Sequence, residues 1–176
     1  MSLHLVASAA PDAAEEGLKL LDRRAVTEAQ MRQHLAGKGF EAAAVNEAVA
    51  LFTARGWIAD GDYAGELVRQ RFAKPGLSRA KLRADMEKRG LDSPEVDAAL
   101  AALDQEFPQW EAQNAWNLLE GKLVGARRGL DLDCAPDRRK LQAKLWRYLA
   151  TRGFDSDISR QAVRRVLDTI TEAPHE

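Results

Sequence analysis

The sequence predicts an all-α fold: an elongated stack of three tandem three-helix repeats, with about nine helices in all. Helical periodicity covers most of the 176 residues, whereas the alternating, β-branched runs typical of strands are nearly absent. Six prolines and twelve glycines interrupt the chain, and they fall between the periodic segments. A third observation, a repeat centred on three glycines, divides the helices into groups of three.

Local signals place the helix ends. Thr27 precedes the second helix as an N-cap, and Gln30 stands where it completes a capping box. Ser78 is placed to cap the fifth helix, and Pro94 suits the first turn of the sixth. We expect helices near residues 12–24, 27–38, 41–55, 60–74, 78–89, 93–106, 109–125, 136–152 and 157–171.

The internal repeat is centred on Gly39, Gly90 and Gly153. Each follows a helix, at the position where a left-handed residue ends it. Apolar residues recur eight and four positions before each glycine, and one, ten and thirteen positions after it. The glycines are 51 and 63 residues apart, so the third repeat carries a longer insert. We expect a flexible N-terminus at 1–11, repeats at 12–56, 57–106 and 107–171, and a tail at 172–176.

The composition excludes several classes of protein. The 26 Lys and Arg are balanced by 27 Asp and Glu, which excludes a uniformly basic, histone-like binder. No run of 18 apolar residues is present, so we expect no membrane association and a cytoplasmic protein. The lone Cys134 cannot form an internal disulfide.

Motifs for catalysis are missing as well. The histidines at 4, 34 and 175 are far apart and have no partners at metal-ligand spacing. No glycine-rich phosphate loop of the Gly-x-x-x-x-Gly-Lys-Ser/Thr type occurs. Acidic neighbours of Cys134 would raise the pKa of its thiol, which disfavours a nucleophile. We therefore expect no catalytic residue, no metal and no cofactor.

The near-neutral net charge hides two basic zones. Residues 69–89 hold eight Lys and Arg against two acids, and residues 122–165 hold twelve against five. Such zones on an acidic background are typical of a strip that follows phosphates. In the eighth helix, Lys140, Lys144 and Arg147 share a face with no acid four residues away. That face is either an anion-binding site or a solvated surface.

The first basic zone is less clear-cut. On the fifth helix, two of the cations have acids four residues further on, as Lys81 has Asp85, which leaves Arg79, Lys88 and Arg89 free. Arg71 falls within the apolar stripe of the fourth helix. It is expected either to bind helix-end carbonyls or a carboxylate of another repeat, or to face a partner.

Several segments resemble the RecX family of recombination regulators. The stretch 60–71, DGDYAGELVRQR, is similar to that family's signature helix. Residues 20–24 with 31–40, then 79–91 and 144–154, resemble its first, second and closing repeats in order. Residues 125–136 match the family poorly. The resemblance covers about residues 15–170, nearly the whole chain.

The resemblance implies a non-enzymatic regulator that binds the RecA recombinase filament on single-stranded DNA and dampens its ATPase and strand exchange. The DNA would be contacted directly or through the filament. We expect a monomer, because the sequence contains no heptad seam. The residues themselves leave the sign of the effect open. They also fit a general DNA-binding helical protein, or a scaffold for another partner. The candidates for contact with a partner or with DNA are Arg69, Arg71, Lys74, Arg79, Lys88, Arg89, Arg127, Arg128, Lys140, Lys144 and Arg147.

Overall fold

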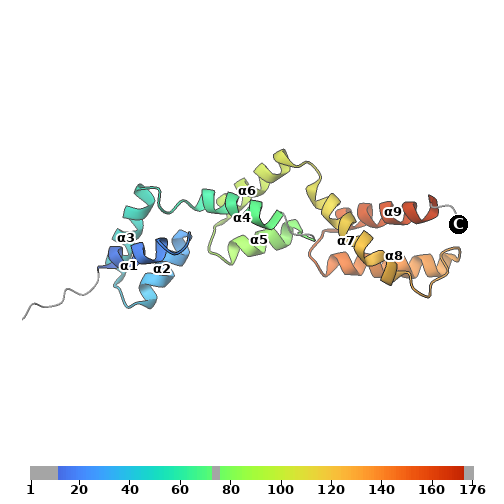
Figure 1. Ribbon diagram of the computed structural model, residues 1–176, viewed down its shortest axis with the longest axis horizontal. Coiled ribbons are helices and arrows are strands. Elements are labelled where there is room, and N and C mark those ends of the chain that lie inside the picture. The colour runs from blue at the N-terminus through green and yellow to red at the C-terminus, as the bar shows by residue number, and fades with distance from the viewer. Residues whose placement is uncertain (1–11, 73–75, 173–176) are drawn as a thin grey trace, which may run out of the picture.

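The computed structural model describes residues 12–72 and 76–172, and within them it contains nine α-helices and no strand. The helices follow one another along an elongated molecule (Figure 1). This confirms the predicted all-α stack. The expectations for residues 1–11, for Lys74 and for the tail at 173–176 fall outside the described ranges. The helices are α1 (Ala13–Leu21), α2 (Glu28–Gly37), α3 (Ala42–Ala54), α4 (Asp60–Phe72), α5 (Arg79–Glu87), α6 (Ser93–Glu106), α7 (Trp110–Ala126), α8 (Ala135–Ala150) and α9 (Ser156–Glu172).

The predicted capping signals are confirmed, whereas the first, fifth and eighth helices end two or three residues earlier than expected. The Thr27 hydroxyl accepts the Gln30 backbone N–H at 3.2 Å, and the Gln30 side chain accepts the Thr27 N–H at 3.4 Å, which completes the capping box. The Ser78 hydroxyl caps α5 by accepting the Lys81 backbone N–H at 3.2 Å, and Pro94 lies in the first turn of α6. The three repeat glycines have φ of +89°, +83° and +81°, the left-handed values expected after a helix.

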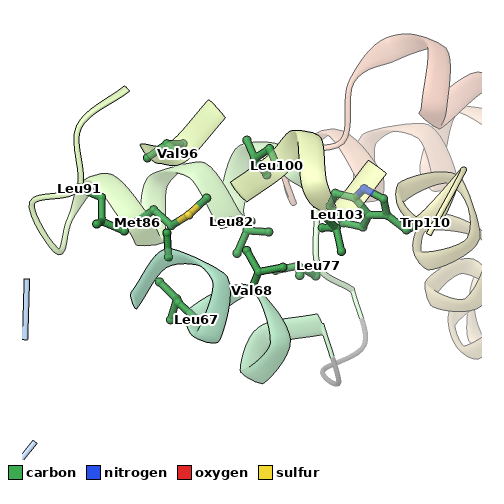
Figure 2. Close-up of a cluster of buried hydrophobic side chains, with 11 residues drawn as sticks. Leu67, Val68, Leu77, Leu82, Met86, Leu91, Val96, Leu100, Leu103 and Trp110 are labelled. Carbon is green, nitrogen blue, oxygen red and sulfur yellow. The ribbon is translucent and has the colours of Figure 1, made fainter. Parts of the chain in front are cut away.

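Each group of three helices buries an apolar cluster largely of its own. In the middle repeat (α4–α6), Leu82 and Met86 of α5 are fully buried between α4 and α6 (Figure 2). Burying one such side chain contributes about 1.5–3 kcal/mol. Trp110, at the start of α7, completes this cluster from the next repeat. The first repeat (α1–α3) is centred on Phe52, and the third repeat (α7–α9) on Leu141, Leu145 and Leu149.

The two junctions between repeats use the same backbone contacts. The Thr27 hydroxyl donates to the Arg89 carbonyl at 2.6 Å, and the Ser78 hydroxyl donates to the Arg152 carbonyl at 2.8 Å. Each capping residue thus also binds the turn of the following repeat, next to its glycine. In the third repeat the corresponding position is the buried Leu141, which has no hydroxyl and cannot continue the series.

A carboxylate completes each junction. Asp60, the first residue of α4, accepts the Glu28 backbone N–H at 2.9 Å. Glu111, in the first turn of α7, accepts the Arg79 backbone N–H at 2.8 Å. Burial raises the pKa of both carboxyl groups above their ordinary values. Each acid therefore binds the free N–H of a helix end in the preceding repeat, and these bonds help to hold neighbouring repeats in a fixed relative orientation.

Candidate functional site

The predicted cations of the middle repeat are largely paired within the protein. Arg71 Nε lies 3.1 Å from an Asp85 carboxylate oxygen. The expectation of a carboxylate from another repeat is wrong, because Asp85 belongs to α5 of the same repeat. The expected pair between Lys81 and Asp85 is also wrong, since Asp85 bonds Arg71 instead. This ion pair joins α4 to α5 beside the core.

Arg79 is not free, contrary to the sequence-based expectation. Its guanidinium pairs with Asp104 of α6 and lies 3.8 Å from Glu111 of α7. The Trp110 indole N–H also donates to Asp104, at 3.0 Å. The hydrogen bond from Arg79 lowers the pKa of Asp104, and the same bond raises the pKa of Arg79. Arg79 is thus part of the junction between the middle and third repeats.

The other candidates in this zone differ in how free their charges are to bind a partner. Arg89 donates to the Tyr63 hydroxyl at 2.8 Å, so its side chain is held in place, but no acid neutralises its charge among the described residues. Arg69 pairs with Glu66 at 3.0 Å, yet 69% of its side chain remains exposed. Lys88 is exposed, and its side chain has no ion pair or hydrogen bond among the described residues.

The third repeat gathers cations around an open groove of about 520 Å³ between α7 and α8. No acidic residue is among its described lining. Lys144 donates to the Ala126 carbonyl at 3.2 Å, which is close to the end of α7. Arg147 donates to a carbonyl of its own helix at 3.2 Å. Both contacts hold the side chains in place without neutralising their positive charge. The lining is Lys122, Ala126, Lys144, Leu145, Arg147, Tyr148 and Thr151.

Tyr148 lies at the centre of this cluster. The Arg152 guanidinium lies 3.7 Å from the centre of its ring, and the Lys122 amine lies 5.2 Å from it. Two cations are therefore held beside a half-buried ring without any carboxylate. We call Lys122, Lys144, Arg147 and Arg152, with Tyr148, the α7–α8 basic cluster.

The remaining predicted cations lie apart from the groove lining. Lys140 pairs with Asp137, three residues earlier, at 2.8 Å. This bond raises the pKa of Lys140 and lowers that of Asp137. Arg127 and Arg128 are exposed just after α7, and their side chains show no partner within the described part of the chain.

Lys122 and Arg152 were not among the predicted candidates. A signal for Arg152 was present, because Lys144 and Tyr148 are four residues apart on α8 and Arg152 follows four residues later, in the turn that ends this helix. Lys122 comes from α7, and its approach depends on how α7 and α8 pack, which a single sequence does not give.

The described residues contain neither a membrane-spanning helix nor a metal-binding cluster. None of their helices is long and apolar enough to cross a membrane. Nor do they contain a group of three His, Cys, Asp or Glu side chains placed to hold a metal ion.

Comparison with known proteins accounts for all three repeats. Models of the first, second and third three-helix domains of RecX match residues 13–50, 60–100 and 132–163, respectively. The chain is 34% identical over 150 residues to the regulatory protein RecX of Xanthomonas oryzae pv. oryzae, covering 85% of this chain and 86% of the relative. It is 35% identical over 150 residues to RecX of Stenotrophomonas maltophilia, with 85% and 84% covered.

The fold agrees with a solved structure. The crystal structure of RecX from Lactobacillus salivarius superposes with a TM-score of 0.75 at 20% identity, over 89% of this chain and 95% of that one. Similarity at this level of identity concerns the fold, whereas the relatives in Xanthomonas and Stenotrophomonas establish the family. The chain therefore belongs to the RecX family of regulatory, non-enzymatic proteins.

Proposed function

We propose that this protein binds the RecA recombinase filament on single-stranded DNA, in the cytoplasm, and dampens its ATP hydrolysis and strand exchange. Membership of the RecX family supports the choice of partner. The proposed contact with DNA rests on one observation, the α7–α8 basic cluster. Its four cations contact carbonyls and a ring rather than acids, so they keep their charge for phosphates.

The shape of the molecule supports a mechanism. Three repeats fixed end to end form an elongated body that lies along the groove of a helical filament (Figure 1). One end contacts phosphates through the α7–α8 basic cluster while the middle repeat contacts protein. Such bridging hinders the entry of a second DNA strand and the turnover of neighbouring recombinase subunits. A monomer is sufficient for this.

The decisive experiment is a titration of the DNA-dependent ATPase of RecA with this protein at two salt concentrations, about 50 and about 200 mM. Binding to bare single-stranded DNA is measured beside it. We expect inhibition at protein concentrations well below those that coat the DNA. An unchanged ATPase with correctly folded protein at stoichiometric amounts would refute the proposal.

The same basic cluster favours a second candidate, a general DNA-binding protein without a specific protein partner. This alternative expects inhibition only when the DNA is saturated, and tight binding to bare DNA that falls steeply with salt. The two arms of the titration therefore separate the two functions.

A further inference from the structure

An apolar groove of about 290 Å³ runs between α4 and α6 of the middle repeat, on a surface that the junctions do not use. Its lining includes the small residues Gly65, Ala99 and Ala102. One end is formed by Phe72 and Phe107, whose rings stack with centres 4.6 Å apart, and Phe107 remains 40% exposed. Arg69, Phe72 and Phe107 also line the groove.

The internal repeat shows which residues of the third repeat correspond to this groove. Ala64 of α4 and Ala115 of α7 are both fully buried, 51 residues apart, and the junction acids Asp60 and Glu111 keep the same spacing. Gly65 therefore corresponds to Trp116. From α6 to α9 the spacing is 63, as between the buried Leu100 and Val163, so Ala102 corresponds to Arg165.

The third repeat occupies the corresponding position with its own side chains. Trp116 is half-buried against the core of that repeat, and the Arg165 guanidinium lies 4.0 Å from the centre of an indole ring. The middle repeat has a glycine and an alanine at these two positions, and the groove is open. A Cβ added at Gly65 would meet only Arg69 Nη1, at 3.6 Å, which is ordinary contact.

We infer that the α4–α6 groove of the middle repeat binds an aromatic side chain presented by a protein partner. The bound ring takes the place that Trp116 has in the third repeat. It stacks beside Phe72 and Phe107, and the exposed Arg69 guanidinium lies at the rim, as Arg165 does over Trp116. Aromatic residues that fill such pockets carry much of the energy of protein interfaces.

The charges around the groove favour a protein over a nucleic-acid base. Glu106 is part of the lining, and Glu66 pairs with Arg69 at the rim. A base entering here would bring its phosphates past both carboxylates, and the nearby Arg71 is already paired with an acid. A protein side chain brings no such charge. That the partner is the recombinase rests on the proposed function, whereas the preference for an aromatic ring does not.

The groove is tested first with a small probe, N-acetyl-tryptophanamide, followed by the amide NMR signals of the full-length protein. We expect millimolar binding that shifts Gly65, Ala99 and Ala102, and loss of these shifts in Gly65→Trp, which fills the groove from within. Ala101→Trp, on the exposed side of α6, is the matched control and should bind normally. Unmoved groove signals, or equal shifts with deoxyadenosine monophosphate, would overturn the inference.

The partner is tested with the same variants in the RecA ATPase titration. We expect Gly65→Trp to need at least about tenfold more protein for half-inhibition, a loss of about 1.4 kcal/mol, with unchanged thermal stability and DNA binding. Ala101→Trp should inhibit like the wild type. Normal inhibition by Gly65→Trp would refute the groove as the recombinase contact. If the wild type itself does not inhibit, the proposed function fails, and the NMR titration still decides what the groove binds.

Discussion

The middle and third repeats share one architecture but use their side chains in opposite ways. In the middle repeat, Arg71 and Arg79 pair with acids, and the groove between its outer helices is open. In the third repeat, Lys144 and Arg147 contact only carbonyls, and Trp116 occupies the corresponding groove position. The comparison shows that similar basic zones in a sequence do not give similar surfaces.

The difference indicates that the two repeats are suited to different kinds of partner. A cation bonded to a carbonyl or an aromatic ring keeps its net charge, whereas one paired with a carboxylate does not. The third repeat is therefore suited to phosphates, and the middle repeat to an apolar protein contact. This difference in use requires that the repeats keep a fixed relative orientation, to which the junction hydrogen bonds contribute.

The largest effect is expected when a junction is broken. An alanine at Gly90 would place its Cβ 2.3 Å from Ala29 Cβ, at a φ of +83°. Overpacking and left-handed strain together should lower the free energy of unfolding by about 3 kcal/mol. Gly39 has φ of +89° but open space around it, so Gly39→Ala should cost only about 1 kcal/mol. Urea unfolding measures both, and equal losses would show that the first junction is not closely packed.

A smaller effect is expected from neutralising the α7–α8 basic cluster. The triple variant Lys122→Gln, Lys144→Gln and Arg147→Gln should weaken binding to single-stranded DNA about tenfold. The slope of log affinity against log salt should fall by about 2, since each phosphate contact on a single strand contributes about 0.7. An unchanged salt slope would place the phosphate contacts elsewhere, with Arg127 and Arg128 the next residues to test.

Unlike those three cations, Arg79 should affect stability rather than DNA binding. Its guanidinium pairs with Asp104 and lies near the buried Glu111, but the pair with Asp104 is partly exposed, so Arg79→Gln should cost about 0.5–1 kcal/mol of stability. Its effect on the salt dependence of DNA binding should be small. Thermal unfolding and a salt series on the same sample compare the two readouts. A large change in salt slope with full stability would mean that the cations of the middle repeat face DNA after all.

Much of the fold could be predicted because the repeat is marked by signals that depend on residues close together in the sequence. The cap at Thr27, the glycine after each second helix and the apolar offsets each depend on a few neighbouring residues. Thr27 and Ser78 were identified only as caps, although their hydroxyls also bond the next repeat. Extending the 51-residue spacing to Asp60 and Glu111 would have revealed the junctions.

The candidate site was harder to predict, because charge pairing depends on which helices pack together. Asp85 lies four residues after Lys81, yet it bonds Arg71 because α4 packs against α5. Asp104 is 25 residues from Arg79 in sequence and still neutralises it. A single sequence gives the number of charges in a zone, whereas tertiary packing decides which of them remain available.

The smallest effect concerns two acids near Arg79 whose pKa values are shifted in opposite directions. Burial raises the pKa of Glu111 above its ordinary value of 4.5, so the folded chain holds this proton more tightly than the unfolded chain. The free energy of unfolding therefore falls as pH rises from about 4.5 through the raised value. The Arg79 hydrogen bond lowers the pKa of Asp104 below 3.8, and its stabilisation is lost as pH falls toward that lower value.

Single amide substitutions separate these two contributions. Relative to the wild type, Glu111→Gln should gain stability between about pH 4.5 and pH 7, because it retains an oxygen for the Arg79 N–H and carries no buried charge. Asp104→Asn should be less stable than the wild type, by an amount that grows as the pH rises toward 3.8 and stays constant above it. Thermal unfolding from pH 3 to pH 8 measures both. If Glu111→Gln instead loses stability as the pH rises, its ion pair with Arg79 outweighs its burial, and the junction depends on charge rather than on the N–H bond.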